Sequence, residues 1–286
     1  MKKIKTALAT LLSLTCLFAA TACEGLQFVT MGGNSTSVEE SSSKLENPIT
    51  EAQWEELLAA FEKTMNSGDN FTYERSINQI ETSESHWEHI KDKHTIKIAG
   101  DLREAKYDNS RKYGEDGEWE YHDSWEIEVY TEELAGVDYR KGEDGWQAGN
   151  FSVADRNEFE SMLSQEKIEE LKEQLEYDKT KKIYYIDEYT MEIDTELVFG
   201  AKLKEGVAEE RISKLEIQLK DGYILRYYVE SIMNVDATLE NEEGETEHIV
   251  MGLDYKNGLK FTNYGTTKIT IPDDIKDEVE ELLKNS

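Results

Sequence analysis

The sequence is poor in cysteine. Only Cys16 and Cys23 occur among its 286 residues. The long remainder behind Cys23 therefore has no thiol for a disulfide or a catalytic nucleophile. We expect that part of the chain to be held together by its apolar core alone.

The chain behind Cys23 also lacks long apolar runs and familiar catalytic motifs. No segment there approaches the ~20 apolar residues of a membrane span. We find no Gly-x-Ser-x-Gly elbow, phosphate-binding glycine loop or dinucleotide fingerprint. The 62 acidic residues make chance carboxylate pairs so common that a glycosidase pair carries no weight. We therefore expect no enzyme activity and no cofactor.

Basic residues are outnumbered. There are 32 Lys and Arg against 62 Asp and Glu, for a formal net charge of −30. A surface of this charge repels nucleic acid and anionic lipid headgroups, so we expect neither as a direct partner. The charge is enough to keep a crowded surface protein dissolved.

The first 23 residues have the layout of a secretory signal. Lys2, Lys3 and Lys5 precede an uncharged, mostly apolar run over residues 7–22, which ends in Ala-Thr-Ala before Cys23. This ending resembles the bacterial lipobox, which implies that residues 1–22 are removed and that Cys23 carries the lipid. The implied product is a lipoprotein anchored in the cell membrane, on its extracytoplasmic face. An uncleaved anchor and an ordinary secretory signal remain the alternatives.

A polar tether is predicted after the signal, over residues 23–47. It is rich in Ser, Gly, Glu, Thr and Asn, so it cannot bury a core. The folded part is then residues 48–286, a normal size for one mixed or β-rich domain.

A helix is expected to open this domain. Thr50 and Gln53 form a capping box, and Gly68 marks the end. One face carries apolar residues at helical spacing: Trp54, Leu57, Leu58, Phe61 and Met65. A partner or membrane surface is possible for such a face, but packing against a sheet is the favoured interpretation.

Most of the remaining chain predicts strands. The segments are residues 71–80, 95–107, 118–131, 137–150, 183–199, 215–219, 223–233, 247–255, 259–264 and 268–271. Hairpin turns are expected at residues 114–117, 142–145, 221–222 and 257–258, because each carries Asp-Gly, Asn-Gly or paired glycines. The first two turns lack the regularly spaced oxygen ligands of an EF-hand calcium loop.

Helices are expected at only two further places, residues 155–177 and 274–284. Because strands and helices do not alternate, a doubly wound parallel sheet is excluded. The pattern predicts an α+β domain built on antiparallel strands.

The order of these segments resembles the lipoprotein-carrier superfamily, the LolA/LppX-like half-barrels. The likeness rests on residues 54–58 after the tether, the dense hairpins, and the ending at residues 261–265 with 269–272. It implies a strongly curved antiparallel sheet wrapped around a few helices. It also implies that a lipid or another apolar ligand binds in a groove between sheet and helices, and it transfers no catalytic residue.

Aromatic residues are the candidates for lining such a groove, since their rings are apolar and Tyr and Trp carry a polar tip. The alternative is that they cover the sheet as ordinary strand residues. The groove candidates are Trp54, Tyr184, Tyr185, Tyr223 and Tyr227.

The one cluster with metal-ligand residue types is His86, Glu88 and His89, with Glu84 and His94 nearby. In a strand, His86 and His89 would point to opposite faces, so we expect no metal there. The sequence thus favours a monomeric, membrane-anchored carrier of a lipid or other apolar ligand. A non-enzymatic envelope interaction or sensory module that recognises a protein is the alternative.

Overall fold

The computed structural model of the chain describes residues 47–66, 70–132, 134–153, 168–169, 171–241 and 243–285. The predicted signal, Cys23 and nearly all of the predicted tether lie outside these residues. The same holds for Gly68 and for residues 154–167, which form the first part of the second predicted helical region.

The helices of the described residues are α2 (Glu51–Met65), α5 (Thr195–Phe199) and α6 (Lys276–Asn285), with 3-10 turns η2 (Lys172–Gln174) and η3 (Asp273–Ile275). The first six strands are β1 (Asn70–Ser83), β2 (Trp87–Ala99), β3 (Leu102–Tyr113), β4 (Trp119–Tyr130), β5 (Ala135–Gly142) and β6 (Gly145–Ser152). The others are β7 (Glu176–Asp178), β8 (Ile183–Ile186), β9 (Tyr189–Glu192), β10 (Lys202–Lys220), β11 (Tyr223–Glu240) and β12 (Thr246–Thr262).

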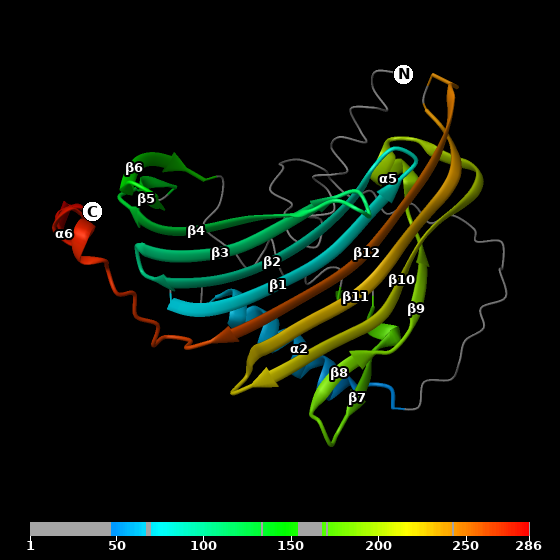
Figure 1. Cartoon of the computed structure of the whole chain (residues 1–286). Helices are drawn as coiled ribbons and strands as arrows, with labels where there is room; N and C mark the ends of the chain where they lie inside the picture. The colour runs from blue at the N-terminus through cyan, green and yellow to red at the C-terminus, as the bar shows by residue number, and fades with distance from the viewer. Residues whose placement is uncertain are drawn as a thin grey trace.

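All twelve of these strands join one antiparallel sheet. Its order is β6-β5-β4-β3-β2-β1-β12-β11-β10-β8-β7, and β9 pairs with β10 beside β8. The sheet is open, with β6 and β7 at its edges, and its long central strands curve strongly (Figure 1). The predicted antiparallel α+β class is confirmed. Irregular pairing in β10 and β11 at Leu203/Glu205, Ile212/Lys214 and Gln218/Leu219 adds local bending.

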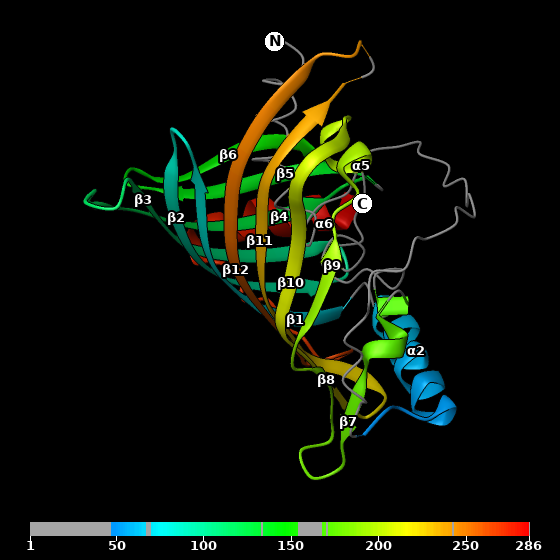
Figure 2. The ribbon, with the colours of Figure 1, turned by 90° about the vertical axis from the view of Figure 1, so that its right-hand side faces the viewer.

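The sheet has two unlike faces, because side chains alternate along each strand. The inner face carries Tyr73, which lies between Ile96 of β2 and Phe261 of β12, and α2 packs on this side. The outer face carries Ile127 and Val129 of β4, against which Ile275 and Val279 pack at the C-terminal end. Helices α2 and α6 thus lie at different ends of the sheet, α2 beside β8 and α6 beside β5 (Figures 1 and 2).

Helix α2 forms as its sequence predicts. Thr50 accepts a hydrogen bond from the backbone of Gln53, and the Gln53 side chain bonds back to the Thr50 backbone. The apolar stripe is the buried side, with Trp54, Leu57 and Phe61 all less than a tenth exposed. Core packing, the favoured interpretation of this stripe, is therefore confirmed.

The predicted tight turns at three places are confirmed. Gly114 and Gly145 have φ of 76° and 110° in the turns after β3 and β5. Asp221 and Gly222 have φ of 56° and 75° between β10 and β11, as the turn of a two-residue hairpin requires.

The predicted strands at residues 215–219 and 223–233 are parts of the longer β10 and β11, and those at 247–255 and 259–264 are both parts of β12. Three further strand predictions were wrong in continuity or type. Residues 95–107 are not one strand, because Gly100 adopts a φ of 62° and turns β2 into β3. Residues 183–199 contain two short strands and α5 instead of one strand. Residues 268–271 form no strand.

The predicted hairpin at Asn257-Gly258 was also wrong, since both residues lie inside β12. Strand pairing on both sides overrides the local turn signal: Asn257 lies opposite Ile77 of β1 and Val229 of β11. A side chain at Gly258 would be crowded. A Cβ atom would lie 3.0 Å from Ser76 Oγ and 3.4 Å from the Tyr228 ring.

Candidate functional site

An apolar strip runs along the inner face of β10, β11 and β12. At one end, Trp54 and Phe61 of α2 pack on Ile217, Tyr227 and their neighbours. At the other end, Phe199 and Val198 of α5 pack in a second apolar cluster. The strip is continuous because Met233 packs against both clusters.

Helix α2 is fastened across one end of this strip. The Tyr184 hydroxyl lies 3.0 Å from the Gln53 carbonyl oxygen and 3.0 Å from Glu56 Oε2. At the other end of the helix, the Ile224 backbone donates to Thr64 Oγ1 over 2.9 Å. Burial and the Glu56 carboxylate raise the pKa of Tyr184, so its hydroxyl stays a donor at neutral pH. The helix is held at both ends by bonds to the sheet.

The five predicted groove residues do not share one surface. Trp54, Tyr184 and Tyr227 lie in the inner apolar cluster and are nearly inaccessible. Tyr185 is opposite Glu216, on the other side of its strand from Tyr184. Tyr223 lies at the turn end of β11.

Tyr223 packs at the rim of the sheet instead. Its ring stacks on Tyr264 with centroids 4.2 Å apart, and Lys63 Nζ lies 3.9 Å from its centroid. Neither of the two clefts described below is lined by any of the five groove candidates. Four of the five therefore belong to the apolar strip or its rim, and Tyr185 belongs to the opposite face.

A polar region, the polar half below, occupies the part of the inner face of β2 and β3 near the β1–β2 turn. Farther along these strands, Ile96, Ile98 and Ala105 on the same face belong to the apolar cluster. The Arg111 guanidinium bonds both carboxylate oxygens of Asp92, with Nη2 donating to Oδ2 over 3.1 Å. His94 Nε2 lies 3.0 Å from Asn109 Oδ1, and burial lowers the pKa of His94 below its ordinary 6.5. The same face therefore changes from apolar to charged across β12 and β1.

A buried amide lies at the border between the two halves. Asn257 is 1% exposed, and its Oδ1 accepts from Arg75 Nε over 3.4 Å. Its Nδ2 is buried and makes no hydrogen bond. A buried donor left without an acceptor costs about 1–3 kcal/mol, which makes this position a candidate contact for a polar group of a ligand.

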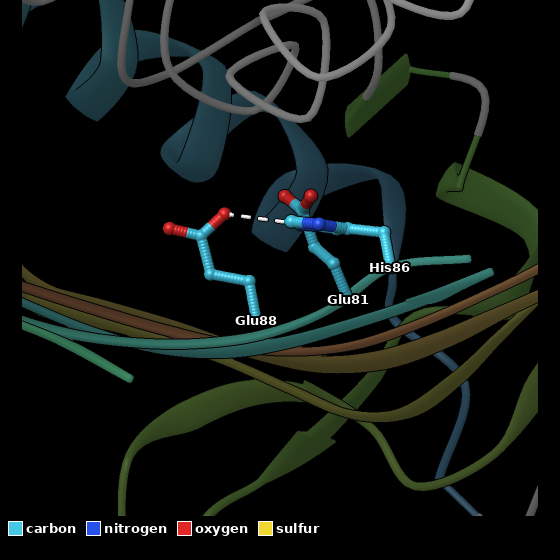
Figure 3. A group of neighbouring side chains, drawn as sticks. All are labelled: Glu81, His86 and Glu88. Atoms are coloured by element: carbon cyan, nitrogen blue, oxygen red, sulfur yellow. Dashed lines mark ion pairs between the residues drawn. The ribbon is translucent and has the colours of Figure 1, made fainter. Parts of the chain in front are cut away.

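The histidines named in the sequence analysis do not meet. His89 lies on the outer face, with Nε2 2.7 Å from Asn78 Oδ1 and its ring centroid 4.9 Å from that of Trp119. His94 lies on the inner face, bonded to Asn109 as above. As expected, His86 and His89 lie on opposite faces of the sheet. His86 lies beside Glu81 and Glu88 of the inner face (Figure 3).

Glu81 was missed by the sequence analysis. It precedes His86 by five residues and enters the cluster because the β1–β2 hairpin sets it opposite Glu88. A signal for this was available in the sequence. Side chains alternate along β1 up to a short turn at residues 84–85, and residues on the two sides of such a turn form cross-strand pairs.

The outer face carries aromatic rings covered by lysines. Lys91 Nζ lies 4.3 Å from the Trp119 ring centroid, and Lys106 Nζ lies 4.5 Å from that of Trp125. The Trp87 ring meets that of His89 edge-on at 6.0 Å. We name Trp87, His89, Trp119 and Trp125, with these lysines, the outer aromatic patch.

Two clefts open beside the outer aromatic patch. One has a volume of about 410 Å³ and is lined by Asn78, Lys91, Lys93, Tyr228 and Lys256 among others. The other has about 540 Å³ and reaches Trp125. Their linings carry charges of both signs: Lys91, Lys93 and Lys256 with Asp92 and Asp108 in the first cleft, and Lys93 and Lys106 with Asp108 and Asp123 in the second.

None of the helices within the described residues has both the length and the hydropathy that crossing a bilayer requires. No protein-family model matches the sequence, and no curated protein matches it either.

Three solved structures show a faint likeness to the chain. An outer membrane lipoprotein-sorting protein domain from Vibrio parahaemolyticus is 7% identical over 78% of this chain and 97% of that chain, with a TM-score of 0.18. An N-terminal dehydratase from the difficidin assembly line is 10% identical over 79% and 87%, with a TM-score of 0.14. A DUF1329 family protein from Desulfovibrio piger is 10% identical over 76% and 94%, with a TM-score of 0.12. Scores this low carry no argument about fold or function.

Proposed function

We propose that the chain is a non-enzymatic binding protein, anchored through lipid on Cys23 at the extracytoplasmic face of a cell membrane. Its ligand is a lipid or other apolar molecule, held between the inner face of the sheet and the helices. The proposal needs no cofactor and no nucleic acid, and it takes the protein to be a monomer.

The observation that carries the proposal is the length of the apolar strip compared with its helices. From Ile224 to Leu239 the strip follows β11 for about 50 Å. Helix α2 is about 22 Å long and lies across one end, while the single turn of α5 lies at the other. Neither helix extends along the strip, but its side chains are buried, and Val229, Val235 and Leu239 are each no more than 1% exposed. An elongated apolar ligand that matches the strip in shape would therefore bind only when this face opens.

The adjoining polar half supports an amphipathic ligand in particular. An acyl chain on the strip would place its polar end near the border, where Arg75 and the free Nδ2 of Asn257 lie. Pairing that amide with a ligand oxygen would remove an unmet hydrogen bond.

Native mass spectrometry tests the proposal directly. A chain beginning at residue 24 is purified without detergent after exposure to a total lipid extract. We expect a bound mass that disappears on denaturation and is identified as lipid after extraction. A clean unliganded mass at all lipid concentrations would refute the carrier function.

A matched pair of variants locates the ligand. Met233→Lys puts a charge on the strip where the two apolar clusters meet, and should abolish the bound mass. Ile232→Lys changes the next residue, which is 37% exposed on the other face, and should leave it intact. Circular dichroism establishes that both variants fold.

The outer aromatic patch favours a second candidate, an interaction module for an envelope protein. Partly exposed aromatic rings beside clefts lined by charged residues are typical of interaction surfaces. The double change Trp119→Ser and Trp125→Ser should then abolish crosslinks to the partner without changing lipid binding. Crosslinks that survive this change would exclude the patch.

A further inference from the structure

We propose that Glu81, His86 and Glu88 form a binding site for a divalent transition-metal ion, with Zn²⁺ as the probe. One ligand atom from each residue lies within 4.8 Å of the other two. The inference is independent of the proposed lipid binding. It shares His86 and Glu88 with the histidine cluster of the sequence, and it has Glu81 in place of His89.

The β1–β2 hairpin builds the site from three sides. Glu81 and Glu88 are directly opposed in the register, so their side chains leave the same face of the sheet. His86 closes the turn between them, because its carbonyl oxygen accepts from the Ser83 backbone over 2.8 Å. Figure 3 shows both carboxylates beside the His86 ring.

The His86 ring has an unused coordinating atom. Its Nε2 is shielded from solvent and makes no hydrogen bond, although Glu88 Oε2 is only 3.4 Å away. Two ligands of a tetrahedral zinc ion, each bound at 2.0–2.1 Å, are about 3.3–3.4 Å apart. The separation of these two atoms therefore matches two ligands that share one metal ion.

Neighbouring groups orient the two carboxylates. Gln79 Nε2 donates to Glu81 Oε1, which fixes the carboxylate of a residue that is 5% exposed. Arg111 Nε lies 3.9 Å from Glu88 Oε1, but both Nη atoms of this guanidinium donate hydrogen bonds to Asp92. Glu88 Oε2, the atom nearest His86, is thus left for the ion.

The ligand set selects the class of metal. Calcium takes six to eight oxygen ligands, whereas one imidazole and two carboxylates suit zinc and related transition metals. Three protein ligands leave a fourth tetrahedral position for water or for a group of a bound molecule.

Isothermal titration calorimetry with Zn²⁺ tests the site. A chain beginning at residue 24, without a histidine tag, has no cysteine to compete for the ion. We expect one Zn²⁺ per chain, with affinity reduced about 100-fold or more in His86→Ala and in Glu88→Gln. The reason is that loss of an outer partner alone usually costs 10–100-fold. Glu88→Gln is nearly isosteric, so it carries the test if His86→Ala fails to fold.

His248→Ala is the matched control. His248 Nε2 also lies 3.4 Å from a carboxylate, that of Asp236, but it belongs to no cluster of three such ligands among the described residues. This variant should bind Zn²⁺ like the unchanged chain. The proposal is overturned if the unchanged chain binds no Zn²⁺, if His86→Ala and Glu88→Gln bind it equally well, or if His248→Ala loses as much affinity.

Discussion

The inner face of one sheet carries two regions of opposite chemistry. On β10, β11 and β12 its positions are held by residues such as Leu215, Ile217 and Val229, all fully buried. Near the β1–β2 turn, the equivalent positions of β2 and β3 hold Asp92, His94 and Arg111. Both regions have the same alternating backbone, so only side-chain chemistry separates them.

The difference separates stability from specificity. Burying apolar surface stabilises the fold by about 25 cal/mol per Å² and needs no exact partner. A buried charge is tolerated only where a partner is positioned for it, as Arg111 is for Asp92. The apolar half therefore holds the domain together, and the polar half holds its charges in specific pairs.

The largest effect should come from the apolar half. Leu215→Ala removes a fully buried side chain and should lower the free energy of unfolding by about 2–5 kcal/mol. Leu203→Ala on the same strand removes one that is 46% exposed, and should cost much less. Urea denaturation measures both, and equal losses would contradict the assignment of the core.

In the polar half, a single change should cost more than a paired one. Arg111→Met leaves the buried Asp92 carboxylate without its guanidinium and should cost about 2 kcal/mol. Adding Asp92→Leu removes the unmet charge, so the double variant should recover part of that loss. A double variant whose loss equals the sum of the two single losses would show that the pair is not coupled.

The smallest effect should be a dependence on pH from His94. Because burial lowers the pKa of His94 below 6.5, the unfolded chain takes up its proton first as the pH falls. The stability contributed by neutral His94 is therefore complete above pH 6.5 and declines as the pH falls toward the lowered pKa. Asp92 partly offsets the shift, while Arg75 and Arg111 add to it.

Replacing this histidine isolates its contribution. His94→Gln, measured by urea denaturation between about pH 5 and pH 8, should flatten the acid side of the stability profile. An unchanged profile would show that His94 does not cause the loss of stability at acid pH.

Local signals predicted the elements whose causes lie within a few residues. The capping box at Thr50 and the turn at Asp221-Gly222 are confirmed, since each depends on backbone bonds or φ values set by nearby side chains. The Asn257-Gly258 prediction failed because its neighbours in space, Ser76 and Tyr228, are distant in sequence. A local turn can thus be predicted from the sequence more reliably than the pairing of strands that are far apart in the chain.

The sequence by itself determined the antiparallel α+β class, the amphipathic α2 and most of the tight turns, because these follow from periodicity and local backbone preference. Only the tertiary structure decided that β1 pairs with β12, which sets Tyr73 opposite Phe261. Only that structure brought Glu81 to His86 and divided the inner face into an apolar and a polar half. Such contacts depend on how a whole sheet curves and closes its core, and no short stretch of residues encodes that.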